Sequence, residues 1–261
     1  MSRTRRSDAD GRRERPLRRC GGDDRGQSNV VGVALLLGIT VVSLGSLTAG
    51  IGAVVDGNAA AADSARVAGD LDAALAPVEA TGADRGRVSF TEGRLETVER
   101  ELRVLNKSGT IRTVTVDALV FSAGDRRVAF LAGAVVRGPP DNARMRTAPP
   151  ITASRNRSDG VLVVGAPALN GSVAYAASGG GSVVLRTTVS HHRTALANDT
   201  YRVAIETATP DAWRRHFRAQ NATVTTRDFD GDGVVSVVAA YPGDRVAYLV
   251  VHDMRLEVRH A

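Results

Sequence analysis

An acidic segment near the C-terminal end has the residues best suited to chemistry. Asp228, Asp230 and Asp232 alternate with Phe229 and two glycines in the order Asp-Phe-Asp-Gly-Asp-Gly. Three carboxylates at alternate positions, with a glycine that permits a sharp turn, can surround a hard cation as in the first half of a calcium loop. A complete EF-hand needs a bidentate glutamate at the twelfth position, where this chain has Ala239, and flanking helices, where the sequence predicts strands. The segment predicts either a calcium site or a solvated acidic hairpin turn.

The other reactive residues form no catalytic motif. His191-His192 is able to bind a metal, but no cysteine or Glu-x-x-His pattern accompanies it, so we expect surface histidines. The chain has neither a Gly-x-Ser-x-Gly nucleophile elbow nor a Gly-x-x-x-x-Gly-Lys-Ser/Thr phosphate loop. The single cysteine, Cys20, lies in the basic N-terminal segment, so no disulfide is expected beyond it. The sequence therefore predicts a protein that is not an enzyme.

Asparagines suggest modification outside the cell. About one of the eight asparagines would precede x-Ser/Thr by chance, whereas five do. The candidate glycosylation sites are Asn106, Asn156, Asn170, Asn198 and Asn221. Asparagine next to Gly, Ser or Asp is also typical of turns, so some of these positions are expected to be turn residues only. Asn106 and Asn170 have the clearest loop-tip sequences.

A charge-free run at residues 27–55 would place these sites relative to a membrane. It exceeds the roughly 20 apolar residues that a helix needs to cross a bilayer. Residues 1–26 contain nine arginines and five acidic residues, so the positive-inside rule keeps this flank cytoplasmic. The leader also supplies most of the formal net charge of +6, and the rest of the chain gives no indication of nucleic-acid binding. We expect a single-pass cell-membrane protein with its C-terminal domain outside.

The junction Arg25-Gly26-Gln27-Ser28 lies before the apolar run, so cleavage there would leave that run on the mature protein. This arrangement resembles the class III signal of archaeal type IV pilins and archaellins. The segment RGQSNVVGVALLLGITVVSLGSLTAGIG is similar to the amino-terminal part of pilin-like surface proteins from halophilic archaea, and the segments EGRLETV, GAVVRG and DFDGDG resemble that group more loosely. The resemblance implies that a prepilin-type peptidase cuts between Gly26 and Gln27.

The same resemblance implies self-assembly or association with other pilin-like subunits through the apolar helix, as in a surface filament. Small residues with a spacing near seven would allow helices to approach closely: Gly32, Gly38, Gly45 and Gly52. Bacterial pilins usually carry a glutamate at the fifth mature position, where this chain has Val31. One alternative is a single-pass receptor or ligand-binding module that never polymerises, and a more distant one is an anchored hydrolase.

The pattern after the apolar run changes from helix to strand. Residues 56–76 are rich in alanine, with Val67, Leu71 and Leu75 at helical spacing, and Pro77 ends the predicted helix. From residue 87, short β-branched runs between turn residues are typical of an antiparallel β domain. Strands are expected at residues 87–91, 95–105, 110–121, 126–131, 160–164, 182–189, 201–207, 222–226, 234–240 and 245–259.

Four connections and one short helix complete this prediction. Turns are expected at residues 92–93, 106–109, 123–125 and 179–181, and a proline-containing surface loop or linker at residues 137–159. Thr209 and Pro210 favour a helix start, after which Trp213, His216 and Phe217 fall on one face. Trp213 is expected to fill the core against the sheet.

The predicted fold class is α+β. A long N-terminal hydrophobic transmembrane helix precedes a mostly antiparallel, β-rich outer domain, a pilin-like sandwich. We expect a basic cytoplasmic leader at residues 1–26, the helix and its outward extension at 27–80, and the outer domain at 81–261. The expected function is a membrane-anchored surface protein with a structural or adhesive role and no cofactor other than calcium.

Overall fold

The computed structural model describes residues 25–155 and 160–260 of an α+β protein, as predicted. The chain divides into two compact units, Met1–Ala53 and Val54–Ala261. The basic leader through residue 24, with Cys20, and the candidate acceptor Asn156 lie outside the described residues. Each unit is described below by itself.

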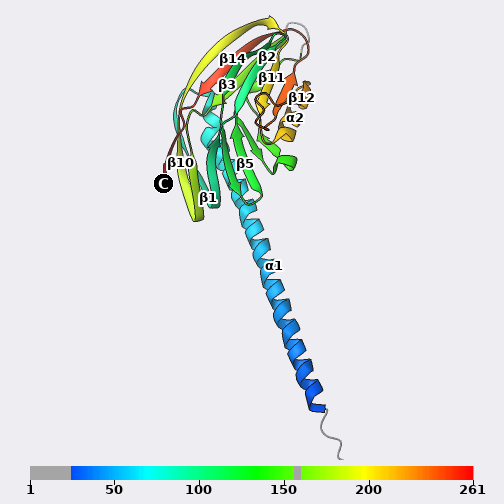
Figure 1. Cartoon of the computed structure of the whole chain (residues 1–261). Helices are drawn as coiled ribbons and strands as arrows, with labels where there is room; N and C mark the ends of the chain where they lie inside the picture. Colours follow the sequence, from blue (N-terminus) through cyan, green and yellow to red (C-terminus); the bar gives the residue numbers. More distant parts are fainter. Residues whose placement is uncertain (1–24, 156–159, 261) are drawn as a thin grey trace, which may run out of the picture. The chain divides into compact units, whose positions relative to one another are not determined.

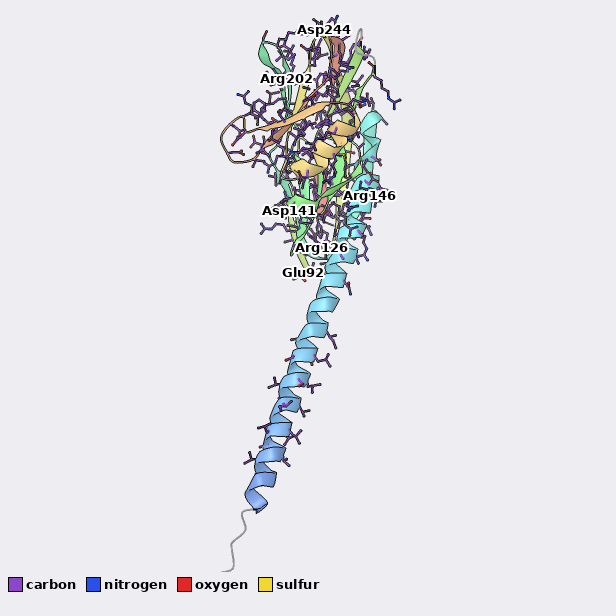
Figure 2. The ribbon with its side chains drawn as sticks, turned by 90° about the vertical axis from the view of Figure 1, so that its right-hand side faces the viewer. Glu92, Arg126, Asp141, Arg146, Arg202 and Asp244 are labelled. Carbon is purple, nitrogen blue, oxygen red and sulfur yellow. The ribbon has the colours of Figure 1, made fainter. Side chains whose placement is uncertain are left out.

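The first unit contains the N-terminal part of helix α1 (Arg25–Leu75). Segment Val30–Ile51 has 22 residues and a mean hydropathy of 2.4, so it is long and apolar enough to cross a membrane. None of this segment is buried. Its apolar side chains project all around the ribbon in Figure 2. The hydroxyl groups of Thr40, Ser46 and Thr48 donate to carbonyls four residues earlier, so they are satisfied within the helix.

The second unit begins with the remainder of α1. Val67, Leu71 and Leu75, which share one helical spacing, are fully or almost fully buried against the β domain. The α-helix ends at Leu75, and a 3₁₀ turn, η1 (Ala76–Glu79), follows. This end of the helix is therefore part of the core of the β domain.

Ten strands form the larger sheet (Figure 1). Its order is β7-β6-β5-β4-β1-β10-β14-β9-β8, β15 also pairs with β10, and only the β14/β9 pair is parallel. The strands are β1 (Gly82–Val98), β4 (Ala118–Ala123), β5 (Arg126–Leu131), β6 (Ala134–Arg137), β7 (Arg144–Thr147), β8 (Ile151–Ala153), β9 (Gly160–Ala168), β10 (Ala174–Asp199), β14 (Arg245–Asp253) and β15 (Glu257–His260).

Five strands form the smaller sheet, whose order is β12-β13-β11-β2-β3. They are β2 (Glu101–Asn106), β3 (Gly109–Thr115), β11 (Arg202–Glu206), β12 (Thr223–Arg227) and β13 (Ser236–Ala240). Two short helical segments, η2 (Pro140–Asn142) and α2 (Pro210–Ala219), complete the domain. Helix α2 has the predicted position, and Trp213 and Phe217 are fully buried in the core.

Strand β4 of the larger sheet is buried on both faces. Leu119 and Phe121 belong to the hydrophobic cluster that contains Leu71 of α1. Val120, which points to the opposite face, belongs to the cluster that contains Val203 of the smaller sheet. The helix end, the larger sheet and the smaller sheet therefore form three layers, with one hydrophobic core on each side of the larger sheet.

The turns predicted at residues 92–93 and 179–181 are wrong. β1 and β10 continue through these positions, and their pairing shifts between Phe90↔Gly181 and Glu92↔Ser178. Gly179 and Gly180, with φ values of +85° and +105°, are the unpaired residues of a β-bulge and do not reverse the chain. Gly93, with a φ of +142°, pairs with Ala177 beside the bulge. The turns predicted at 106–109 and 123–125 are confirmed as hairpins.

Several predicted strands are divided between sheets. Residues 95–105 contribute to β1 and β2, and residues 110–121 to β3 and β4, so the chain crosses to the smaller sheet and returns. Asp117, with a φ of +48°, lies at the return point. Residues 245–259 form two strands of the larger sheet, β14 and β15, instead of one. The predicted loop at 137–159 contains η2, β7 and β8. Hydrophobic runs marked these strands, but their division depends on pairing between distant segments.

Candidate functional site

The acidic turn connects strands β12 and β13, as the sequence predicted. The Asp228 carboxylate accepts hydrogen bonds from the backbone amides of Gly231, at 2.8 Å, and Gly233, at 3.1 Å. Asp232 accepts one from the amide of Val234 at 2.7 Å. One oxygen each of Asp228, Asp230 and Asp232 lie within 4.8 Å of one another. The turn therefore brings the three predicted ligands together, and it also uses two of them to fix its own backbone.

Asp230 belongs to a second acidic group that the sequence did not indicate. Its carboxylate lies within 4.8 Å of those of Glu101, on β2, and Glu206, on β11. Arg103 Nη2 donates to Asp230 Oδ2 at 3.1 Å, and the same guanidinium contacts Glu101 and Glu206, the latter at 3.8 Å. Arg100 Nη1 pairs with Glu206 Oε1 at 3.2 Å. Arginine side chains thus supply the positive charge within this group.

Burial shapes the electrostatics of Glu206, whose side chain is only 6% exposed. Its pKa is raised, chiefly by burial; Arg100 and Arg103 oppose the shift, whereas Asp230 and Asp232 add to it. The Arg103 guanidinium also lies 4.9 Å from the ring centroid of Phe229. A metal among Glu101, Glu206 and Asp230 would have to displace this guanidinium, so the carboxylates of the turn itself are better placed for a cation. Calcium binding there stays a prediction.

Only one of the two histidines expected at the surface, His192, is exposed. His191 is half-buried, and its Nδ1 lies 2.9 Å from Nδ1 of the paired His252 on β14. His252 Nδ1 also lies 2.8 Å from the Val78 carbonyl oxygen, and because a carbonyl only accepts, we assign the proton to His252 Nδ1. No metal-binding group in the described part of the chain includes these histidines.

The candidate glycosylation sites differ in the accessibility of their side-chain amides. Asn170 lies in the connection after β9, as predicted, whereas Asn106 is the last residue of β2 and pairs with Gly109 beside the hairpin turn. Their Nδ2 atoms donate to Asp199 at 3.0 Å and Asp253 at 2.7 Å. The bond from Asn170 is the main reason for the lowered pKa of Asp253. Asn198 and Asn221 are exposed, and their side chains make no hydrogen bond within the described residues, so these two are the more accessible acceptors.

The predicted cleavage junction lies in the first turn of α1, because Gly26 and Gln27 directly follow Arg25 in the helix. The apolar segment follows at once. A Cβ atom added at Gly32, Gly38 or Gly45 would meet no described atom within 4 Å, so the backbone at these glycines is open.

Comparison with known proteins gives one match. The model of a family of unknown function (DUF7289) matches residues 25–257. None of the curated proteins matches the chain, and none of the solved structures does. The matched region begins one residue before Gly26, and it includes the apolar helix and both sheets.

Proposed function

The chain belongs to this family of unknown function, and from that premise we propose that it is a membrane-anchored, non-catalytic surface protein of the type IV prepilin kind. The observation that carries the proposal is the apolar segment Val30–Ile51, which begins three residues after Gln27 and has no buried residue. A helix covered by nothing and free of charge is suited to lipid or to a bundle of like helices.

The continuity of α1 supports a mature protein that keeps the apolar segment. A conventional secretory signal is removed together with its apolar core. Here the apolar residues belong to the same helix whose later residues, Val67, Leu71 and Leu75, pack in the core of the β domain. Processing before Gln27 would keep that helix whole, whereas processing after the apolar run would divide it.

The extent of the family match gives further support. The matched region starts at residue 25, so the junction and the apolar helix belong to the part that the family shares, and residues 1–24 do not. Arginines before the helix favour a cytoplasmic leader. The exposed acceptors Asn198 and Asn221 suit a β domain that faces outward, with a structural or adhesive role.

Sequencing the N-terminus of the membrane-bound protein tests the processing step. The full chain with a C-terminal tag is expected to start at Gln27, and Gly26→Leu is expected to keep the leader. Gly22→Leu, a matched change within the leader, is expected to be processed normally. A wild-type protein that starts at residue 1 or 2, or after the apolar run, would reject the prepilin route.

The alternative is a single-pass receptor or ligand-binding module that does not polymerise. Val31 favours it, because this residue stands where the glutamate of bacterial pilins pairs with a neighbouring subunit. Shearing cells and isolating filaments separates the two functions. Enrichment of the protein in sheared filaments supports assembly, and its retention in the membrane fraction supports the receptor.

A further inference from the structure

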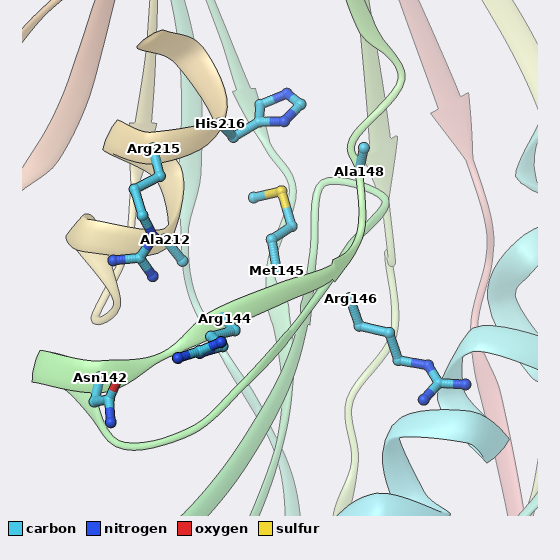
Figure 3. A pocket seen from close by; sticks show the side chains of 8 residues that line it. All are labelled: Asn142, Arg144, Met145, Arg146, Ala148, Ala212, Arg215 and His216. Atoms are coloured by element: carbon cyan, nitrogen blue, oxygen red, sulfur yellow. The ribbon is translucent and has the colours of Figure 1, made fainter. Parts of the chain in front are cut away.

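A hollow of about 650 Å³ lies between helix α2 and the edge strand β7 of the larger sheet. Figure 3 shows its side chains, which come from the end of η2, from β7 and the residue after it, and from α2. The hollow is lined by Asn142, Arg144, Met145, Arg146, Ala148, Ala212, Arg215 and His216. Its volume is within the range of small-molecule sites.

Three arginines line this hollow and no carboxylate does. Arg146 extends toward α1, where its Nε lies 3.7 Å from Asp72 Oδ2. Arg144 is exposed, and its side chain has no ion pair or hydrogen bond with any described residue. Arg215 donates to the carbonyl oxygen of Ala143, a neutral acceptor that positions the guanidinium without balancing its charge.

The surrounding acidic residues do not neutralise Arg144 and Arg215. Asp211, the first acidic residue of α2, pairs with Arg214 at 2.5 Å. Asp141 precedes Asn142 but does not line the hollow. Two guanidinium groups that face one hollow repel each other, and this repulsion is relieved when an anion lies between them.

His216 adds a neutral polar group to the wall. Burial lowers its pKa, so the ring is uncharged at neutral pH. Its Nε2 lies 3.0 Å from Gln220 Nε2, and the amide of Gln220 is oriented by a bond to the Ile151 carbonyl at 2.8 Å and one from the Tyr241 hydroxyl at 2.9 Å. The positive charge of the hollow therefore comes from its arginines alone.

The geometry points to a binding site for an oxyanion group, a carboxylate, sulfate or phosphate, on a ligand up to the size of a monosaccharide. Guanidinium groups recognise such groups through paired N–H donors. Arg144 and Arg215 supply the charge-assisted hydrogen bonds, and the Asn142 amide supplies a further donor. Met145, Ala148 and Ala212 offer apolar surface to the body of the ligand. This site does not depend on whether the helix spans a membrane or assembles.

Calorimetric titration of the full chain in a non-ionic detergent tests the site. The probes are sodium glucuronate, inorganic sulfate and inorganic phosphate at constant ionic strength, with glucose as the neutral control. Saturable binding of at least one anion and none of glucose is expected. The anion that binds most tightly identifies the preferred oxyanion.

The double variant Arg144→Gln, Arg215→Gln is expected to weaken that binding at least tenfold. Arg112→Gln is the matched control. Arg112 is also exposed and donates to a backbone carbonyl, that of Ile111, but it lies on β3 and does not line the hollow. It should bind within twofold of the wild type. Absence of saturable binding for all three anions, or equal affinity of the double variant and the control, would overturn the proposal.

The melting temperature without ligand tests whether Arg144 and Arg215 repel each other. At low salt and without a binding anion, Arg144→Gln is expected to raise the melting temperature, because it removes repulsion from Arg215. The difference in melting temperature should shrink at 1 M sodium chloride, where the Debye length is about 3 Å and exposed charges farther apart than this are largely screened. A lower melting temperature at low salt would mean that Arg144 already has a stabilising partner, which contradicts the site.

Discussion

Arg103 connects the acidic turn to the smaller sheet through one guanidinium. It contacts Asp230 of the turn together with Glu101 and Glu206, and the side chains of Arg103 and Glu206 are 9% and 6% exposed. Removing one partner of a buried ion pair leaves the remaining charges without compensation. The Arg103 side chain therefore couples the position of Asp230 in the turn to the charge of Glu206.

Replacing Arg103 by methionine is expected to lower the free energy of unfolding by about 3 kcal/mol. Because the pKa of Glu206 is already raised and loses an opposing cation, part of this loss should be recovered as the pH falls and Glu206 takes up a proton. Urea unfolding of the full chain in detergent, followed through the single tryptophan, Trp213, measures the effect. Arg112→Met is the exposed control. Equal stability of both variants at pH 7 would contradict the role of Arg103.

Calcium binding by the turn is testable at the same scale. If Asp228, Asp230 and Asp232 bind calcium, millimolar calcium raises the melting temperature of the wild type more than equal magnesium does, because magnesium demands near-ideal octahedral geometry and gives up its water reluctantly. The double variant Asp228→Asn, Asp232→Asn is expected to lose that rise while Arg103 keeps Asp230. An unchanged wild-type melting temperature would leave the turn as an acidic hairpin only.

The lowered pKa of His216 makes the free energy of unfolding depend on pH. Its folded-state pKa lies below that of the unfolded chain, so the unfolded chain binds the proton more readily. The stability contributed by the neutral ring is present above the unfolded pKa of about 6.5 and is lost as the pH falls below it. The unfolding free energy of the wild type should therefore fall more steeply between pH 7.5 and 5.5 than that of His216→Gln. Parallel pH profiles would contradict this assignment.

Elements whose pattern is local were predictable from the sequence. Val67, Leu71 and Leu75 marked the buried face of α1, and Thr209-Pro210 marked the start of α2. The acidic hairpin was also visible, because its three aspartates lie within five consecutive residues. Glu101 and Glu206 were not, since they reach Asp230 from two other strands. Likewise, the glycines at 93 and 179–180 look like turn residues until β1 and β10 are seen to pair across them.

Gly86 lies where the helix packs tightly on the sheet. A Cβ atom at this position of β1 would lie 2.2 Å from Cβ of Ala74 in α1. Gly86→Ala is therefore expected to displace the helix and to cost about 1–3 kcal/mol of unfolding free energy.

Gly57→Ala is the control for this substitution. Gly57 lies in α1 with no described atom within 4 Å of an added Cβ, so alanine there should be neutral or stabilising by up to about 1 kcal/mol. Urea unfolding followed through Trp213 compares the two. Equal effects of the two substitutions would contradict the close packing at Gly86.

At the scale of the whole molecule, one helix serves two environments. Its apolar segment Val30–Ile51 has no protein contact that buries it, whereas its last turns belong to the core of a three-layer domain. The sequence indicated both parts, because the charge-free run and the spaced leucines are each visible locally. The three-layer arrangement needed the structure, since adjacent residues of β4 pack against different layers.

Labelling intact cells with a membrane-impermeant maleimide tests the central claim, an anchored protein with its β domain outside, most directly. Cys20 is the single cysteine, so a chain processed before Gln27 has none. Thr225→Cys places one on the exposed surface of β12. The proposed topology predicts labelling of this variant in intact cells at the level seen after lysis, and no labelling of the wild type. Labelling only after lysis would place the β domain inside the cell and contradict the proposal.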